Sequence, residues 1–241
     1  MAATTTVKLP PQYHLRPGRR SDLAPATHIY QAAFDPDMLP DILFPSRHEH
    51  PQDFLAFLSR LFDDRYWSPQ WILTVICGSS GSSDGGGNDA PVGFTWWKRP
   101  LSELSIWERW LSPYAILSAF VRRYHKIRNW LLPIPTQDKR CTAVFERVCA
   151  QVFPTILVTP RRKEAWYLST LAVDPKLHGL GLGSALLRDG LAKVEKRGLA
   201  AWLIGVVGTD KYYSRFGFGR VGAVNVGELS HWDGGFVMFK E

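Results

Sequence analysis

The sequence lacks any long hydrophobic run, and it shows no internal repeat. Crossing a bilayer as a helix requires about 20 consecutive apolar residues, and no stretch of this chain approaches that length. The first part of the chain includes Lys8, Pro10 and Arg16 and has no apolar segment typical of a secretion signal. We therefore expect a protein that neither spans a membrane nor is secreted, located in the cytoplasm, with the nucleus as an open alternative.

Cysteine is also scarce. The chain has three, Cys77, Cys141 and Cys149, with neither CxxC nor zinc-ligand spacing. This pattern argues against a disulfide framework and against a structural zinc site. We expect reduced thiols and no metal.

The sequence does contain enough apolar material for a large core, since 45% of its 241 residues are hydrophobic and 21% are charged. A chain of this size lies within the range of one elaborated domain. We expect residues 1–241 to form a single domain.

Positive charge is concentrated in one segment. Residues 101–163 contain eleven Lys or Arg against four Asp or Glu, so this segment carries the whole net charge of +7. Such an excess could attract phosphates, nucleic acid or an acidic partner. It could equally be a solvated helix surface, and the sequence leaves both interpretations open.

The N-terminal part begins with a strand and then a helix. Residues 13–16 predict a short strand, and Ser21 and Asp22 offer an N-cap for a helix over residues 23–34. A second helix is expected at residues 51–62, where apolar residues recur at helical spacing.

A hairpin should follow. Residues 71–77 and 92–98 are rich in β-branched and aromatic side chains, as strands are. Between them lies a low-complexity loop, residues 78–91, dominated by Gly and Ser. It has too few hydrophobic residues to pack, so we expect a disordered hairpin tip.

Residues 101–160 have a different character and look like a helical insertion, with helices predicted at 101–111, 113–132 and 136–153. One side of the middle helix is apolar and includes Ile116, Phe120, Ile127 and Trp130. We expect this side to pack on the protein's own domain. A basic amphipathic helix with Trp can also lie on a membrane, and that alternative stays open.

The remaining elements are a strand at 165–173, a glycine-rich turn and a helix at 184–197, which Gly198 should end as a C′ residue. Beyond it we expect a strand at 200–207, a short helix at 210–216 and a closing strand pair at 218–226 and 235–239.

The glycine-rich turn is the segment whose residue pattern points to chemistry, because three glycines alternate at the start of a helix. Gly179, Gly181 and Gly183 would let an anion approach the unpaired N–H groups and the positive dipole of a helix N-terminus. A dinucleotide motif would need a glycine where Ser184 stands, and a P-loop would need Gly-Lys-Ser/Thr. The turn therefore predicts a phosphate cradle of another kind, or a tight turn without a ligand.

Two ordered motifs give this region a specific resemblance. Residues 171–175 read Leu-Ala-Val-Asp-Pro and are followed by His178-x-x-Gly181-x-Gly183, and residues 212–218 read Tyr-Tyr-Ser-Arg-Phe-Gly-Phe. This order resembles the GNAT superfamily of N-acetyltransferases, including fungal members with a helical insertion. The resemblance implies an α/β fold with a mixed, mostly antiparallel twisted sheet flanked by helices.

The resemblance also implies acetyl-CoA as cofactor, with coenzyme A as product. Backbone groups at the end of the strand would run along the pantetheine arm, and the amides of the turn would receive the pyrophosphate. The implied cofactor-binding residues are Leu171, Ala172, Val173, His178, Gly179, Leu180, Gly181, Leu182, Gly183 and Ser184. His178 stands where the family usually has Gln or Arg, and a neutral imidazole offers fewer donors to phosphate than guanidinium does.

For catalysis, the resemblance implies an acyltransferase in which an amine attacks the thioester directly. Tyr213 matches the family's tyrosine, which assists the departing thiolate as general acid or hydrogen-bond donor. The general base is not evident: Tyr167 stands at the strand position where relatives often have Glu, and Glu164 lies on the opposite face of an ideal strand. His125, in the segment 101–160, is another possible base.

The acceptor is expected to be a small-molecule or peptide amine, with no nucleic-acid or membrane partner. The oligomeric state is open. Two alternatives remain at this stage: a non-catalytic, coenzyme A-binding module of the same fold with a protein or nucleic-acid partner, and a nucleic-acid binder that uses the basic segment.

Overall fold

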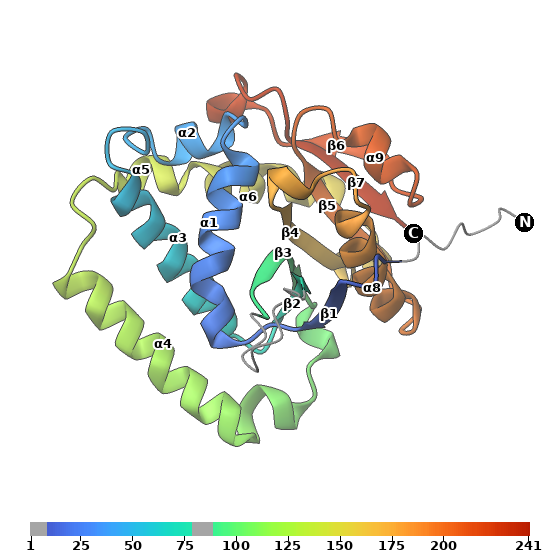
Figure 1. Ribbon diagram of the computed structural model, residues 1–241, viewed down its shortest axis with the longest axis horizontal. Coiled ribbons are helices and arrows are strands. Elements are labelled where there is room, and N and C mark those ends of the chain that lie inside the picture. The colour runs from blue at the N-terminus through green and yellow to red at the C-terminus, as the bar shows by residue number, and fades with distance from the viewer. Residues whose placement is uncertain (1–8, 79–88) are drawn as a thin grey trace, which may run out of the picture.

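The computed structural model describes residues 9–78 and 89–241. Its centre is a seven-stranded sheet in the order β1-β2-β3-β4-β5-β7-β6, in which only the β4–β5 pair is parallel (Figure 1). The sheet is therefore mixed and mostly antiparallel, as predicted. Its strands are β1 (Tyr13–Pro17), β2 (Trp71–Gly78), β3 (Pro91–Lys98), β4 (Trp166–Val173), β5 (Ala201–Gly205), β6 (Gly219–Ala223) and β7 (Phe236–Lys240).

Helices flank the sheet on both faces. They are α1 (Leu23–Phe34), α2 (Leu39–Leu43), α3 (Pro51–Tyr66), α4 (Pro113–Leu131), α5 (Lys139–Thr142), α6 (Val144–Ile156), α7 (Pro160–Lys163), α8 (Leu182–Glu195) and α9 (Asp210–Ser214). Three of them, α1, α3 and α6, cover one face, and α8 covers the other (Figure 1).

The two faces follow from strand alternation. Trp96 and Trp97 are both almost fully buried on β3, yet they belong to different cores. Trp96 packs with Leu23 of α1 and Phe62 of α3, whereas Trp97 packs with Leu187 of α8. Successive strand residues point to opposite sides of a sheet, so each core receives one indole.

Most elements of strong periodicity are confirmed. The hairpin is formed by β2 and β3, and the helix predicted at 51–62 continues to Tyr66. Gly198 has φ of 66° just after α8, which suits its predicted place at the helix end. The disordered tip is predicted at residues 78–91. Residues 79–88 lie outside the described residues, whereas Gly78 belongs to β2 and Pro91 to β3.

Two predicted helices are wrong in extent. Residues 101–111 form a single 3₁₀ turn (Leu101–Glu103) and a separate π-helical turn (Trp107–Leu111), because the backbone of Leu104 between them is extended. The helix predicted at 136–153 is two helices, α5 and α6, that meet at Ala143.

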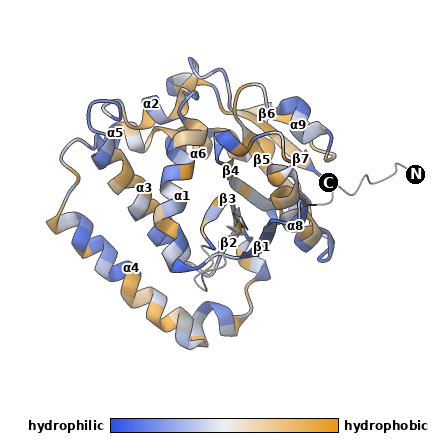
Figure 2. Cartoon of the chain, in the orientation of Figure 1, coloured by the Kyte–Doolittle hydropathy of each residue, from blue (hydrophilic) through white to orange (hydrophobic). Residues whose placement is uncertain are grey.

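Helix α4 forms where predicted, but its orientation is the reverse of the prediction. Its polar residues Ser118 and His125 are buried, while Phe120 is 69% exposed and Trp130 is 78% exposed. The helix lies at the periphery of the molecule, and apolar residues are visible along it in Figure 2. The expected packing of its apolar side on the domain is therefore wrong.

Polar contacts hold α4 to the end of α3. His125 lies 3.0 Å from a carboxylate oxygen of Asp63 and 2.6 Å from one of Asp64. The guanidinium of Arg122 donates to the carbonyl of Trp67 at 2.8 Å. These contacts explain why the polar side of the helix faces inward.

All three cysteines are free thiols, as expected. Among the residues described, no helix has the length and apolar character needed to cross a bilayer.

Candidate active site

The site begins where two parallel strands separate. Pairing between β4 and β5 ends at Leu168 and Leu203, while β4 continues to Val173. At the same place the register of β3 against β4 shifts, so that Trp97 opposes Leu168, Trp96 opposes Thr170, and Ser169 is left over as a bulge. A bulge bends its strand and re-aims the side chains on either side of it.

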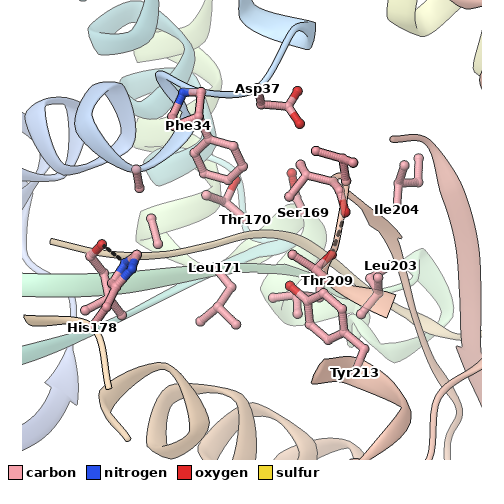
Figure 3. Close-up of a pocket in the computed structure, with 17 residues that line it drawn as sticks. Phe34, Asp37, Ser169, Thr170, Leu171, His178, Leu203, Ile204, Thr209 and Tyr213 are labelled. Carbon is pink, nitrogen blue, oxygen red and sulfur yellow. Dashed lines mark hydrogen bonds between the residues drawn. The ribbon is translucent and has the colours of Figure 1, made fainter. Parts of the chain in front are cut away.

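The gap between the diverging strands is a cavity of about 300 Å³ (Figure 3). Its walls come from the end of α1, the outer half of β4, the end of β5 and the start of α9. Residues named in Figure 3 that line it are Phe34, Asp37, Ser169, Thr170, Leu171, His178, Leu203, Ile204, Thr209 and Tyr213. The sequence-predicted residues Leu171, Ala172, Val173, His178 and Tyr213 are thus brought together at one cavity.

The glycine-rich turn connects this cavity to α8. Gly179 and Gly181 have φ of 83° and 78°, a left-handed conformation that glycine adopts without strain. Gly181 is the N-cap residue, so α8 begins at Leu182, before the predicted start. Gly183 and Ser184 lie in the first turn, where backbone N–H groups have no partner within the helix.

His178 faces the strand rather than the surface of the turn. Its Nε2 lies 3.1 Å from the carbonyl oxygen of Val173 (Figure 3). A carbonyl only accepts, so Nε2 carries the proton and donates it. The imidazole therefore ties the turn to the end of β4.

Tyr213 lies on the opposite wall, near Leu171 (Figure 3). Its ring meets those of Tyr212 and Phe218 edge to face, with centroids 5.1 and 6.0 Å away. Among the described residues, none forms a hydrogen bond with its hydroxyl. Burial raises the pKa of the Tyr213 phenol, so the group stays protonated and can act as a donor.

Asp37 is the functional candidate that sequence reasoning missed. It lines the cavity although only 6% of it is exposed. One carboxylate oxygen accepts from the backbone N–H of Leu39 at 2.8 Å and from the indole of Trp232 at 3.0 Å, while the other is buried without a partner. Desolvation raises the pKa of Asp37, and these two hydrogen bonds oppose the shift.

A buried carboxyl with one unpartnered oxygen at a cavity is typical of a proton-accepting group. No sequence signal marks it, because Asp37 follows α1 in an ordinary Asp-Pro-Asp turn and its partner Trp232 lies near the other end of the chain.

Comparison with known proteins agrees with this architecture. Residues 107–218 match the model of the acetyltransferase (GNAT) family. The chain has the GNAT acetyltransferase fold.

Solved structures resemble it over almost its whole length. Histone acetyltransferase HPA2 and related acetyltransferase from Corynebacterium glutamicum ATCC 13032 aligns with a TM-score of 0.56 and 20% identity, covering 95% of this chain and 96% of the other. An N-acetyltransferase from Staphylococcus aureus Mu50 aligns with a TM-score of 0.52 and 14% identity, covering 94% and 99%. At these identities the likeness concerns the fold.

The other base candidates lie elsewhere in this GNAT fold. The ring of Tyr167 stacks on Trp202, with centroids 4.2 Å apart, and burial raises the pKa of its phenol, which makes it a poor proton acceptor. Glu164 lies before β4 and its carboxylate bonds the hydroxyl of Ser102. His125 is buried at α4 against Asp63 and Asp64 and does not line the cavity.

One group of potential metal ligands exists among the described residues, formed by His14, Cys77 and Asp89. The cation of Arg16 already bonds Asp89 at 2.7 Å, and burial raises the pKa of the Cys77 thiol to about 11. A neutral thiol beside a guanidinium is unsuited to a metal ion, which needs the thiolate.

Proposed function

We propose that this protein transfers the acetyl group of acetyl-CoA to the amine of a small molecule or peptide. The observation that carries the proposal is that one cavity is lined by the end of β4 with His178, which leads into the glycine turn, and also by Asp37 and Tyr213. Acetyl-CoA would supply the thioester, and coenzyme A would leave as the product.

The cofactor would lie along the outer half of β4 and end on the turn. Backbone groups of Leu171, Ala172 and Val173 would bind the pantetheine arm. The amides of the turn would bind the pyrophosphate, through Gly179, Leu180, Gly181, Leu182, Gly183 and Ser184. In support, the space over Gly179 is open, since a Cβ added there would meet nothing within 4 Å.

His178 would position the glycine turn in this arrangement. Because its Nε2–H is already donated to Val173, the ring would hold the turn against β4 rather than bind phosphate directly. This role differs from that of the Gln or Arg usual at the position, which offers further donors.

Asp37 would be the general base. Its unpartnered oxygen would take a proton from the acceptor ammonium, directly or through a water molecule, and the free amine would attack the thioester carbon. A carboxyl whose pKa is raised holds that proton better than an ordinary Asp does, which brings it closer to the amine in basicity. A backbone N–H of β4 would polarise the thioester carbonyl.

Tyr213 would donate its hydroxyl hydrogen bond to the departing sulfur. Complete proton transfer from an ordinary phenol to a thiolate is uphill by roughly 2 kcal/mol. Burial of Tyr213 makes full transfer harder still, so we assign it the role of donor. Tyr167 and Glu164 remain weaker candidates for proton transfer because of the contacts described above.

The domain boundaries remain part of this proposal: one GNAT-like domain over 1–241 with a helical insertion at 101–160, similar to that of fungal members. The family match begins at residue 107, inside that segment, so it leaves the insertion open. We further propose that the protein works in the cytoplasm, with the nucleus as the alternative.

The test is to incubate the protein with acetyl-CoA and a panel of amines while following free thiol and the mass of the acetylated amine. Transfer above the background rate supports the enzyme. Tight coenzyme A binding in calorimetry without any transfer would instead support the non-catalytic module. Failure to bind coenzyme A would overturn both.

A further inference from the structure

Arg65 is a cation that the mechanism above does not use. It lies near the end of α3, with its guanidinium carbon 4.4 Å from the ring centroid of Trp71 and 5.9 Å from that of Phe62. Its Nη1 donates to the hydroxyl of Thr170 at 3.3 Å, and its Nε is buried without a partner. Within residues 9–78 and 89–241, no carboxylate forms an ion pair with it.

Other arginines with little exposed side chain do have a counter-ion. Arg16, Arg47 and Arg99, with 3–14% of the side chain exposed, each bond a carboxylate at 3.4 Å or closer. A buried guanidinium without a counter-ion is costly, and desolvation accordingly lowers the pKa of Arg65 to about 10. An anionic ligand would remove that cost.

Arg65 lines two further cavities next to the β4 bulge. Two cavities, of about 680 and 350 Å³, are both lined by Arg65, Tyr167 and Ser169. Ser169 also lines the cavity that contains Asp37, so the three hollows meet at the bulge. A molecule whose amine reached Asp37 from this side would extend toward Arg65.

The walls of the larger cavity suit an anionic and partly aromatic molecule. Five of its lining residues are Lys or Arg and two are Glu. Aromatic rings of Phe145, Tyr167 and Trp202 supply an apolar surface at the same place. Arginine binds carboxylates in two-point contacts, which favours this anion over a halide or a neutral group.

We infer that the acceptor is an aromatic amino acid, whose carboxylate pairs with Arg65 while its amine is presented to the β4 bulge. This inference rests on the proposed acetyl transfer and adds the class of acceptor to it.

The experiment compares tryptophan with tryptamine and phenylalanine with phenethylamine, which differ only by the carboxylate. We expect wild-type protein to prefer the amino acid of each pair by about 10- to 100-fold in kcat/KM, since a charge-assisted pair to a buried group is worth that much. Arg65→Met should abolish the preference, and Arg65→Lys should restore part of it. Arg60→Met, on the same helix but outside these cavities, is the matched control and should keep it.

Calorimetric titration of the same pairs onto protein saturated with coenzyme A separates this inference from the proposed function. Carboxylate preference in binding without any acetylation would overturn acetyl transfer and retain the role of Arg65. Equal affinity and equal rates for both members of each pair would overturn the Arg65 inference alone. A preference that survives in Arg65→Met would also overturn it.

A second inference concerns the outward side of α4 and stands on a separate observation. The helix contains no Asp or Glu, and its exposed side combines large apolar residues with the cations Arg123 and Lys126. The exposed apolar residues are Ile116, Leu117, Phe120, Tyr124, Ile127 and Trp130. The neighbouring π-helical turn adds Trp107, Arg109 and Trp110, all exposed.

Trp and Tyr beside Lys and Arg are enriched where a protein meets the headgroup region of a bilayer. A single peripheral helix presents a line of contacts that can lie flat on a surface, and the positive charge of segment 101–163 complements anionic headgroups. The sequence-based expectation of no membrane partner depended on α4 facing inward, which the exposed fractions contradict. We propose that α4 binds the surface of anionic membranes.

Co-sedimentation with phosphatidylcholine vesicles, with and without phosphatidylserine, tests this. We expect binding only with phosphatidylserine, weakened by added salt because the charge interaction is screened. The double variant F120S/W130S should lose binding at unchanged melting temperature, and Val221→Ser, at an exposed apolar residue of β6, is the matched control. Absence of wild-type binding would overturn the proposal, as would a dimer that the double variant dissociates in light scattering.

Discussion

The carboxylate of Asp37 accepts a 3.0 Å hydrogen bond from the indole of Trp232, although the two residues lie 195 positions apart. This contact joins the loop after α1 to the loop before β7. It uses one carboxylate oxygen, and the other is buried without a hydrogen-bond partner among the described residues. The two hydrogen bonds to the first oxygen fix the orientation of the carboxylate.

Asp37→Asn should reduce the rate of transfer by about 100- to 10,000-fold, the usual contribution of a general base. The amide can still accept from Leu39 and Trp232, so the fold should persist. Initial rates with an accepted amine are the measurement. A variant with wild-type turnover would remove Asp37 from the mechanism.

The same variant should be at least as stable as wild type at neutral pH. Because the pKa of Asp37 is raised by folding, its contribution to stability is fully present below its unfolded pKa, near 3.9, and is lost as pH rises through the folded value. The increase in melting temperature of Asp37→Asn over wild type should therefore be larger at pH 7 than at about pH 4. Thermal melts at both pH values check this, and a gain that grows on acidification would contradict it.

Tyr213→Phe removes one hydroxyl and keeps the ring between Tyr212 and Phe218. If the hydroxyl assists the leaving sulfur, the rate should fall by roughly 10- to 1,000-fold. Coenzyme A affinity and melting temperature should change little. Joint loss of stability and affinity would show that the residue matters as a core aromatic instead.

The phosphate site is best tested at Leu180. Gly181→Glu would combine charge with strain, because Gly181 has positive φ, whereas Leu180 is 43% exposed and has an ordinary backbone. Leu180→Glu should weaken coenzyme A binding by at least about tenfold through repulsion of the pyrophosphate. Leu180→Gln, nearly the same in shape, is the control in calorimetry. Equal affinities for the two variants would place the pyrophosphate elsewhere.

Alanine should destabilise the protein at one glycine of α8 and be tolerated at another. A Cβ on Gly190 would lie 2.2 Å from the indole nitrogen of Trp97, so Gly190→Ala should destabilise the protein by about 1–3 kcal/mol. A Cβ on Gly183 would meet Tyr212 and Val173 at 3.4 and 3.8 Å, so Gly183→Ala should be near neutral. Urea unfolding measures both, and equal losses would contradict the assigned packing.

Elements with strong local signals could be predicted from the sequence. The periodicity of residues 51–62 and the alternation of the β2–β3 hairpin are properties of short windows. The glycine turn is also a property of a short window. Gly179 and Gly181 stand at positions where the backbone takes a positive φ, which glycine adopts without strain.

Other features depend on contacts that no window contains. The periodicity of α4 predicts an apolar side but not which way it faces, and three polar contacts to the end of α3 decided that. Asp37 became a candidate only through Trp232 and the cavity. Leu104 broke a predicted helix because its backbone is extended, which its residue type does not indicate.

The bulge at Ser169 changes which residue positions of β4 face each side of the sheet. Before it, Trp166 and Leu168 point toward α8, and after it Leu171 and Val173 do so, so the parity of the inward positions switches from even to odd. If positions are counted backward in twos from Val173, Tyr167 falls on the α8 side of the sheet. Because the count crosses the bulge, that side is wrong, and Tyr167 packs on the side of α6. Deleting Ser169 would restore a single parity along β4, so one half of the strand would have to present its side chains to the opposite face of the sheet.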